Sequence, residues 1–179
     1  MNRSKVGGTL ILVVLGNVCQ AADWREKLTK ELPLLGHRNW IVVADSAYPA
    51  QSRAGIETIV TEADQLEVVK AVFAAIDKSH HVRPIVFTDA ELKRVPEQHA
   101  KGITSYREEL GKLLMRREVS AVPHEELIGR LDKAGEMYRI IIFKTTMTLP
   151  YSSVFIQLDC GYWSPAAERK LREAIRAEK

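Results

Sequence analysis

The sequence has few cysteines, little net charge, and none of the short motifs that mark common enzyme classes. It contains two cysteines in 179 residues, and a chain of this length can bury a core without disulfides. The net charge is only +3 and no basic block occurs, which argues against nucleic acid as a partner. GxGxxG, P-loop, HExxH and G-x-S-x-G patterns are absent, so nucleotide-fingerprint, zinc-protease and serine-hydrolase classes lack support.

The five histidines do not have the spacing of a metal site. Three or four converging ligands would be needed, so we expect no metal and no cofactor. The pair His80-His81 is interpreted as a solvated connection between a helix and a strand, and His99 as a surface residue of a polar loop.

The N-terminus has the pattern of a secretory signal peptide. Arg3 and Lys5 precede the run VGGTLILVVLGNV, which has the length of a signal h-region and is too short for a comfortable membrane span. Cys19 and Ala21 stand three and one residue before a plausible cleavage site. We therefore predict a signal peptide over residues 1–21 and a periplasmic or secreted mature protein without a stable membrane span.

A lipoprotein site at Cys19 is the alternative, and the bulky Val18 before it disfavours this reading. Cleavage at Ala21 would remove two basic residues and no acidic one, so the net charge would fall from +3 to +1. It would also leave Cys160 as a lone cysteine, which we interpret as a small buried apolar residue.

Apolar periodicity divides the rest of the chain into alternating strands and helices. Strands are predicted at residues 40–44, 56–60, 84–87, 138–143 and 153–160. Helices are predicted at 23–36, after a capping box at Thr61–Asp64, after another at Ser105–Glu108, at 124–134, and after Ser164-Pro165. The alternation predicts an α/β fold: a layered α/β/α single domain over residues 22–163 with a mixed or mostly parallel sheet, followed by an appended charged helix at 164–179.

Five residues next to predicted strands or helices carry groups suited to acid/base chemistry or to binding hydroxyls: His37, Asp45, His124, Tyr151 and Ser153. His37 lies where a helix turns into the strand at 40–44, and Asp45 falls at that strand's carboxyl end, where ligands gather in parallel sheets. Taken singly, each residue is more often a turn, cap or packing residue than a functional one.

The pattern LGH-x4-VVAD-x2-YP-A, residues 35–50, resembles the N-terminal signature of the D-ribose pyranase / L-fucose mutarotase family (RbsD/FucU). IETIVTEADQLEVVKAVFAAI at 56–76 and LPYSSVFIQL at 149–158 are similar to later elements of the family, closer to its fucose mutarotase branch. The resemblance implies an RbsD-like fold and a cofactor-free isomerase that interconverts anomers or ring forms of a free monosaccharide.

Carried over by position, the resemblance implies that His37 is the proton donor and that Tyr151 is a second catalytic residue. It implies that Asp45, His124 and Ser153 bind the substrate. Ser153 departs from the family pattern, which has asparagine there, and Trp40 replaces a residue that is often acidic.

The spacing of His37 and Asp45 suggests how a site could be assembled. Eight residues of extended strand span about 26 Å, much more than a monosaccharide. Either the segment bends sharply near one end, or His37 of one subunit meets Asp45 of the next. We therefore expect a homo-oligomer, such as a pentameric or decameric ring, with a monosaccharide bound between subunits.

Three functions stay open from the sequence. The first is an exported sugar mutarotase. The second is a non-catalytic periplasmic saccharide-binding or assembly module on the same fold, which Ser153 and Trp40 favour. The third is another cofactor-free enzyme, an isomerase or lyase of sugar acids, with His37 as base.

Overall fold

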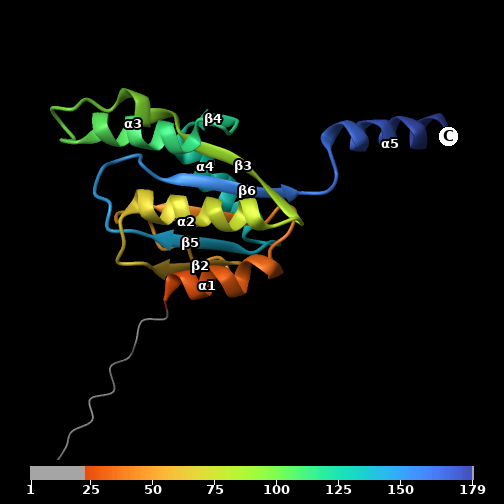
Figure 1. The fold of residues 1–179 in the computed structure, drawn as a ribbon, viewed down its shortest axis with the longest axis horizontal. Coiled ribbons are helices and arrows are strands. Elements are labelled where there is room, and N and C mark those ends of the chain that lie inside the picture. Colours follow the sequence, from red (N-terminus) through yellow and green to blue (C-terminus); the bar gives the residue numbers. More distant parts are fainter. Residues whose placement is uncertain (1–22, 179) are drawn as a thin grey trace, which may run out of the picture.

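The computed structural model describes residues 23–178, so the predicted signal peptide at 1–21 lies outside the described residues. A six-stranded sheet has the order β2-β5-β1-β6-β3-β4 (Figure 1). The strands are β1 Trp40–Ala44, β2 Ile56–Val60, β3 Val82–Asp89, β4 Val119–Val122, β5 Ile140–Lys144 and β6 Val154–Cys160. The helices are α1 Trp24–Glu31, α2 Gln65–Lys78, α3 Ile103–Leu114, α4 His124–Ala134 and α5 Pro165–Ala177, with 3₁₀ turns η1 Leu32–Leu34 and η2 Ala90–Arg94.

The sheet is mixed, because β6 runs antiparallel to both of its neighbours, β1 and β3. The other pairings, β1–β5, β2–β5 and β3–β4, are all parallel. The predicted α/β fold with a mixed sheet is confirmed. We call the edge where the five parallel strands end the carboxyl edge, and the opposite edge the amino edge.

Helices cover both faces of the sheet, as the continuous apolar run of β1 requires. Ile41 and Val43 point to one face and join a core with residues of α1, α2 and α3. Trp40, Val42 and Ala44 point to the other face and join a core with α4. All five residues of β1 are buried, so β1 is a central, rigid strand.

The antiparallel β6 brings distant parts of the chain to the same edge. Its first residue, Val154, pairs with Val43 near the end of β1 and with Thr88 near the end of β3. Its last residue, Cys160, pairs with Val82 at the start of β3. Residues just before β6 therefore lie at the carboxyl edge, and residues at its end lie at the amino edge.

Both predicted capping boxes were wrong about where the helix begins. Asp64 itself caps α2, accepting hydrogen bonds from the backbone N–H groups of Leu66 (2.9 Å) and Glu67 (3.3 Å). The Thr61 hydroxyl instead donates to the Lys144 carbonyl at 3.1 Å. Because aspartate is as good a cap as threonine, the motif placed the start three residues early.

Helix α3 begins at Ile103, upstream of the predicted box. Gly102 precedes it with φ of +94°, a left-handed conformation that glycine adopts without strain. The Glu97 carboxylate accepts the backbone N–H groups of Gly102 (2.5 Å) and Thr104 (2.9 Å), and these bonds lower the pKa of Glu97 to about 2. The cap comes from an earlier turn, which the local motif could not indicate.

Three further details differ from the sequence predictions. Strand β3 extends beyond 84–87 at both ends, and the short strand β4 was not predicted. His80 is exposed as expected, but His81 is partly buried and fixes the turn after α1. Its Nε2 lies 3.2 Å from the Leu32 carbonyl oxygen and 3.0 Å from that of Leu35.

Helix α5 begins as predicted, with the Ser164 hydroxyl accepting from the backbone N–H of Ala167 at 3.1 Å. It extends away from the body of the molecule (Figure 1), and the described part of it has no buried residue. Within residues 23–178, no helix combines the length and the apolar character needed to cross a membrane.

Candidate functional site

Four of the five predicted site residues gather at the carboxyl edge. Asp45 follows β1, His124 begins α4 after β4, and Tyr151 and Ser153 precede β6. Because β6 lies between β1 and β3, Ser153 stands between the ends of those two strands. This edge is where parallel α/β sheets collect their ligands.

Asp45 and Ser153 form a closed pair of hydrogen bonds. The Asp45 backbone N–H donates to Ser153 Oγ (3.2 Å), and that hydroxyl donates to Asp45 Oδ2 (2.9 Å). Asp45 Oδ1 accepts from the Ala47 backbone N–H at 2.9 Å. Ser153 is fully buried, so in this conformation it can affect a ligand only by holding the Asp45 carboxylate.

His124 is held at both its main chain and its ring. Its backbone N–H lies 3.1 Å from both carboxylate oxygens of Glu91, and its Nδ1 lies 3.0 Å from Asp89 Oδ1. The ring meets that of Tyr151 edge-on, with centroids 5.6 Å apart and planes at 81°. Tyr151 has φ of +57°, a conformation that is uncommon for a residue with a side chain and is often found at functional sites.

Asp89 is the residue at this edge that the sequence analysis missed. It is the last residue of β3 and is 2% exposed. Burial raises its pKa to about 6, against the lowering effect of the hydrogen bond with His124. Its Oδ2 has no hydrogen-bond partner in residues 23–178. A strand predicted to end at residue 87 gave no reason to examine a carboxylate two residues later.

Tyr48 lies at the carboxyl edge and packs on the α4 side of the sheet. It is buried, and its hydroxyl donates to Gln51 Oε1 at 3.0 Å. Burial, followed by the charges of Asp89 and Asp45, raises the pKa of the Tyr48 phenol. Lys144 Nζ donates to the Tyr48 carbonyl at 2.8 Å, tying the loop after β1 to the end of β5.

His37 lies at the opposite, amino edge. Its Nδ1 is 2.8 Å from Asp159 Oδ1 in β6, and Arg83 of β3 also binds Asp159. Burial alone would raise the pKa of Asp159, but the Cys160 backbone N–H and the Arg83 guanidinium outweigh burial and lower it. This cluster borders a hollow of about 520 Å³ that reaches the start of α5.

The structure therefore separates His37 from Asp45 within one chain. Strand β1 pairs with β5 along its whole length and with β6 over Trp40–Val43, so no sharp bend brings the two together. The strand alone spans about 13 Å between the two edges. Of the two arrangements expected from the sequence, only the one between subunits is compatible with the fold of a single chain.

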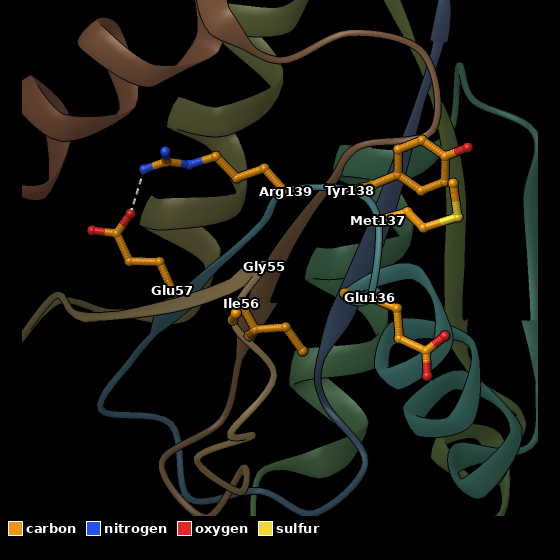
Figure 2. A pocket seen from close by; sticks show the side chains of 9 residues that line it. Gly55, Ile56, Glu57, Glu136, Met137, Tyr138 and Arg139 are labelled. Carbon is orange, nitrogen blue, oxygen red and sulfur yellow. Dashed lines mark hydrogen bonds and ion pairs between the residues drawn. The ribbon is translucent and has the colours of Figure 1, made fainter.

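A second hollow at the amino edge, of about 460 Å³, lies where β2 and β5 begin (Figure 2). Figure 2 shows the Arg139 guanidinium turned toward Glu57, with a nitrogen–oxygen distance of 2.7 Å. Lys27 also binds Glu57 at 2.8 Å. Lys27 and Arg139 both bind Glu31 as well, so two cations and two carboxylates neutralise one another beside this hollow.

Within residues 23–178, no group of three or more His, Cys, Asp or Glu side chains is placed to hold a metal ion. Cys160 is partly buried at the end of β6, next to Asp159.

The sequence model of the RbsD / FucU transport protein family matches residues 25–161. The chain belongs to this family. The match begins within α1, covers all six strands of the sheet and ends before α5. No curated protein gives a significant match.

Solved structures of RbsD/FucU proteins share the fold. Bacillus subtilis RbsD complexed with D-ribose is 21% identical, with a TM-score of 0.55 over 74% of this chain and 91% of that one. Fucose mutarotase from Streptococcus pneumoniae in complex with L-fucose is 18% identical, with a TM-score of 0.50 over 74% and 91%. FucU from Bifidobacterium longum is 15% identical, with a TM-score of 0.51 over 75% and 94%.

Proposed function

We propose that this RbsD/FucU protein is an exported mutarotase for a free monosaccharide and acts by acid/base catalysis without a cofactor. Family membership supports the reaction class, and two solved relatives carry D-ribose and L-fucose. The observation that carries the proposal is the grouping of Asp45, His124 and Tyr151 at one edge, with a second histidine, His37, exposed at the other.

The reaction needs two proton transfers. A base removes the proton of the anomeric hydroxyl while an acid protonates the ring oxygen, so the bond from C1 to the ring oxygen breaks and an open-chain carbonyl forms. Rotation about the C1–C2 bond and closure on the other carbonyl face reverse both transfers. Imidazoles suit this chemistry, because their pKa lies near working pH.

We assign the acid to His37. Its side chain is 56% exposed, so it can reach a sugar held by another molecule. Asp159 fixes the ring through Nδ1 and leaves Nε2 as the atom that would face the ring oxygen. Asp45 would accept hydrogen bonds from sugar hydroxyls, and Tyr151 would contact the sugar through its ring or its phenol.

The site is proposed to form between subunits of a homo-oligomeric ring. The amino edge of one copy would present His37 to the carboxyl edge of the next, and this head-to-tail contact closes if the rotation permits. Oligomerisation would then be a condition for catalysis, and a strictly monomeric protein with full activity would refute this part of the proposal.

Saturation-transfer NMR on fucose, ribose and galactose tests the function directly. The protein should accelerate exchange between anomers of at least one of them, and His37→Ala should remove the acceleration while the protein still binds sugar. His99→Ala, in an exposed loop, is the matched control and should leave the rate unchanged.

A saccharide-binding module on the same fold is the second candidate. The observation that favours it is Ser153, whose hydroxyl is occupied by Asp45 where the family pattern has an amide. Binding shifts without accelerated exchange would select this reading. A new product signal from a sugar acid would select the isomerase or lyase.

A further inference from the structure

The second proton-transfer group can be inferred from the structure at the carboxyl edge. We propose that Asp89 is a positioning residue that holds the His124 imidazole with its proton on Nδ1, so that Nε2 is the base for the anomeric hydroxyl. This inference rests on the proposed function for the substrate, but the state of the His124 ring is a property of the protein alone.

The geometry around His124 supports this assignment. Asp89 Oδ1 lies 3.0 Å from Nδ1, and Glu91 holds the backbone N–H of the same residue. The ring is therefore fixed at its main chain and at one nitrogen. Nε2 has no hydrogen-bond partner within the described residues and is the nitrogen left for a ligand.

Asp89 and His124 differ in exposure. A base must be reachable by the substrate, whereas a residue that positions it can be buried. The Asp89 side chain is fully buried, while the His124 side chain is 23% exposed and meets Tyr151, itself a predicted site residue. Asp89 therefore does not touch a bound sugar, whereas His124 can. An aspartate that orients an imidazole and stabilises its charged form is the arrangement used in catalytic triads.

Ionised Asp89 can only accept a hydrogen bond, which forces the proton of neutral His124 onto Nδ1. Protonated Asp89 would donate to Nδ1, move the imidazole proton to Nε2 and remove the base. Because burial raises the pKa of Asp89 to about 6, the pair should change state slightly below neutral pH.

Other titratable and charged groups surround this pair, and they set its state together with burial. Beyond burial, Glu91 and Asp45 raise the pKa of Asp89. Burial, together with nearby carboxylates that include Asp89, raises the pKa of the Tyr48 and Tyr106 phenols. Lys93 and Arg107 line the same hollow as Asp89, between α3 and β4.

The decisive test reads the ring directly. In the full-length protein labelled with ¹⁵N-histidine, the His124 signals are assigned by their loss in His124→Gln. At pH 7.5 we expect His124 to be protonated on Nδ1 and unprotonated on Nε2. Protonation on Nε2 would overturn the proposal, whether or not the protein turns over a sugar, and this reading needs no variant of Asp89.

The second arm is kinetic. Asp89→Asn should lower kcat for mutarotation about 100-fold, the lower end of what a general base contributes, with KM nearly unchanged and the acid limb near pH 6 lost. Asp132→Asn, a surface carboxylate on α4 paired with Arg53, is the matched control and should leave kcat unchanged. A kcat for Asp89→Asn within threefold of the wild type would overturn the proposal.

Sugar exchange tests the proposed function, and the protonation of the His124 ring tests the role of Asp89. If no sugar exchanges faster with wild-type protein, the proposed function fails, and the ring state of His124 still decides the role of Asp89. If sugars exchange and the ring is protonated on Nε2, the proposed function stands and this inference fails.

Discussion

The two edges of the sheet each carry an aspartate hydrogen-bonded to a histidine, yet the pKa values of the two aspartates are shifted in opposite directions. Asp89 faces His124 from full burial, and its pKa is raised to about 6. Asp159 faces His37 but also binds Arg83 and the Cys160 backbone N–H, and its pKa is lowered. The Cys160 backbone N–H, together with the Arg83 cation, outweighs burial at Asp159, and among the described residues Asp89 has no comparable pair of donors.

The two histidines also differ in exposure: the His37 side chain is 56% exposed and the His124 side chain 23%. His37 is open at the amino edge, and the pKa of its aspartate is lowered, so the carboxylate is ionised near neutral pH. His124 meets the Tyr151 ring edge-on, and the pKa of its aspartate is raised to about 6, close to that of free imidazole. We take this as a division between an acid that is presented to a neighbour and a base that stays in place.

Removing either imidazole should have the largest effect on activity. If one of the two removals had no effect, the two edges could not both supply a proton-transfer group. His37→Ala and His124→Ala should each lower kcat for mutarotation by roughly 10²–10⁴, because each removes one proton-transfer group. Anomer exchange by NMR measures both. A large effect of one variant and none of the other would show that the two edges do not contribute equally to the reaction.

The link between Asp45 and Ser153 should affect binding more than turnover. Ser153→Ala leaves Asp45 Oδ2 without its hydrogen bond in a buried position, which should destabilise the fold by about 1–3 kcal/mol and raise KM. Thermal unfolding and NMR titration measure the two effects. Ser105→Ala, which removes a single long hydrogen bond on the exposed face of α3, should change neither.

The unfolding free energy should change with pH in opposite directions for the two aspartates, Asp89 and Asp159. The pKa of Asp89 is raised on folding, so its contribution is fully present below its unfolded value of 3.8 and is lost as pH rises through about 6. Relative to Asp89→Asn, the wild type should therefore lose on the order of 1–3 kcal/mol of unfolding free energy between pH 4 and pH 7.

Asp159 should behave in the opposite way. Its pKa is lowered, so its stabilising contribution is present above about pH 4 and is lost as pH falls further. Denaturant unfolding of Asp159→Asn should show a deficit at pH 7 that shrinks below pH 4. Equal pH slopes for the two asparagine variants would contradict the assigned environments.

The smallest effect is expected from α5. The described part of this helix contributes no buried residue, so a chain ending at Trp163 should keep its unfolding free energy within about 0.5 kcal/mol. A thermal melt of the truncated protein checks this. A large loss would mean that α5 packs against another copy in solution.

The elements that decide the fold could be predicted because their signals are local. The apolar runs at 40–44 and 153–160 indicated buried strands, and the structure has β1 and β6 there. The family resemblance located the five predicted site residues. The structure brings Asp45, Ser153, His124 and Tyr151 to one edge, although it leaves their roles as predictions.

The partners of the two histidines could not be predicted, because each lies far away along the chain. Asp89 is 35 residues from His124, and Asp159 is 122 residues from His37. The parallel pairing of β3 with β4 sets Asp89 opposite Val122, two residues before His124. The position of β6 between β1 and β3 brings Asp159 to the amino edge, where His37 lies. The two capping boxes failed for a related reason, since a better or more distant cap was available in the folded chain.

Co-expression of His37→Ala with Asp45→Asn tests most directly whether one subunit supplies the acid and the next supplies the sugar-binding edge. Each variant alone should be almost inactive. In a mixed ring, about a quarter of the seams would combine an intact His37 with an intact Asp45, so activity should return to about a quarter of wild type. Mixed oligomers that stay as inactive as the two parents would contradict a site shared between subunits.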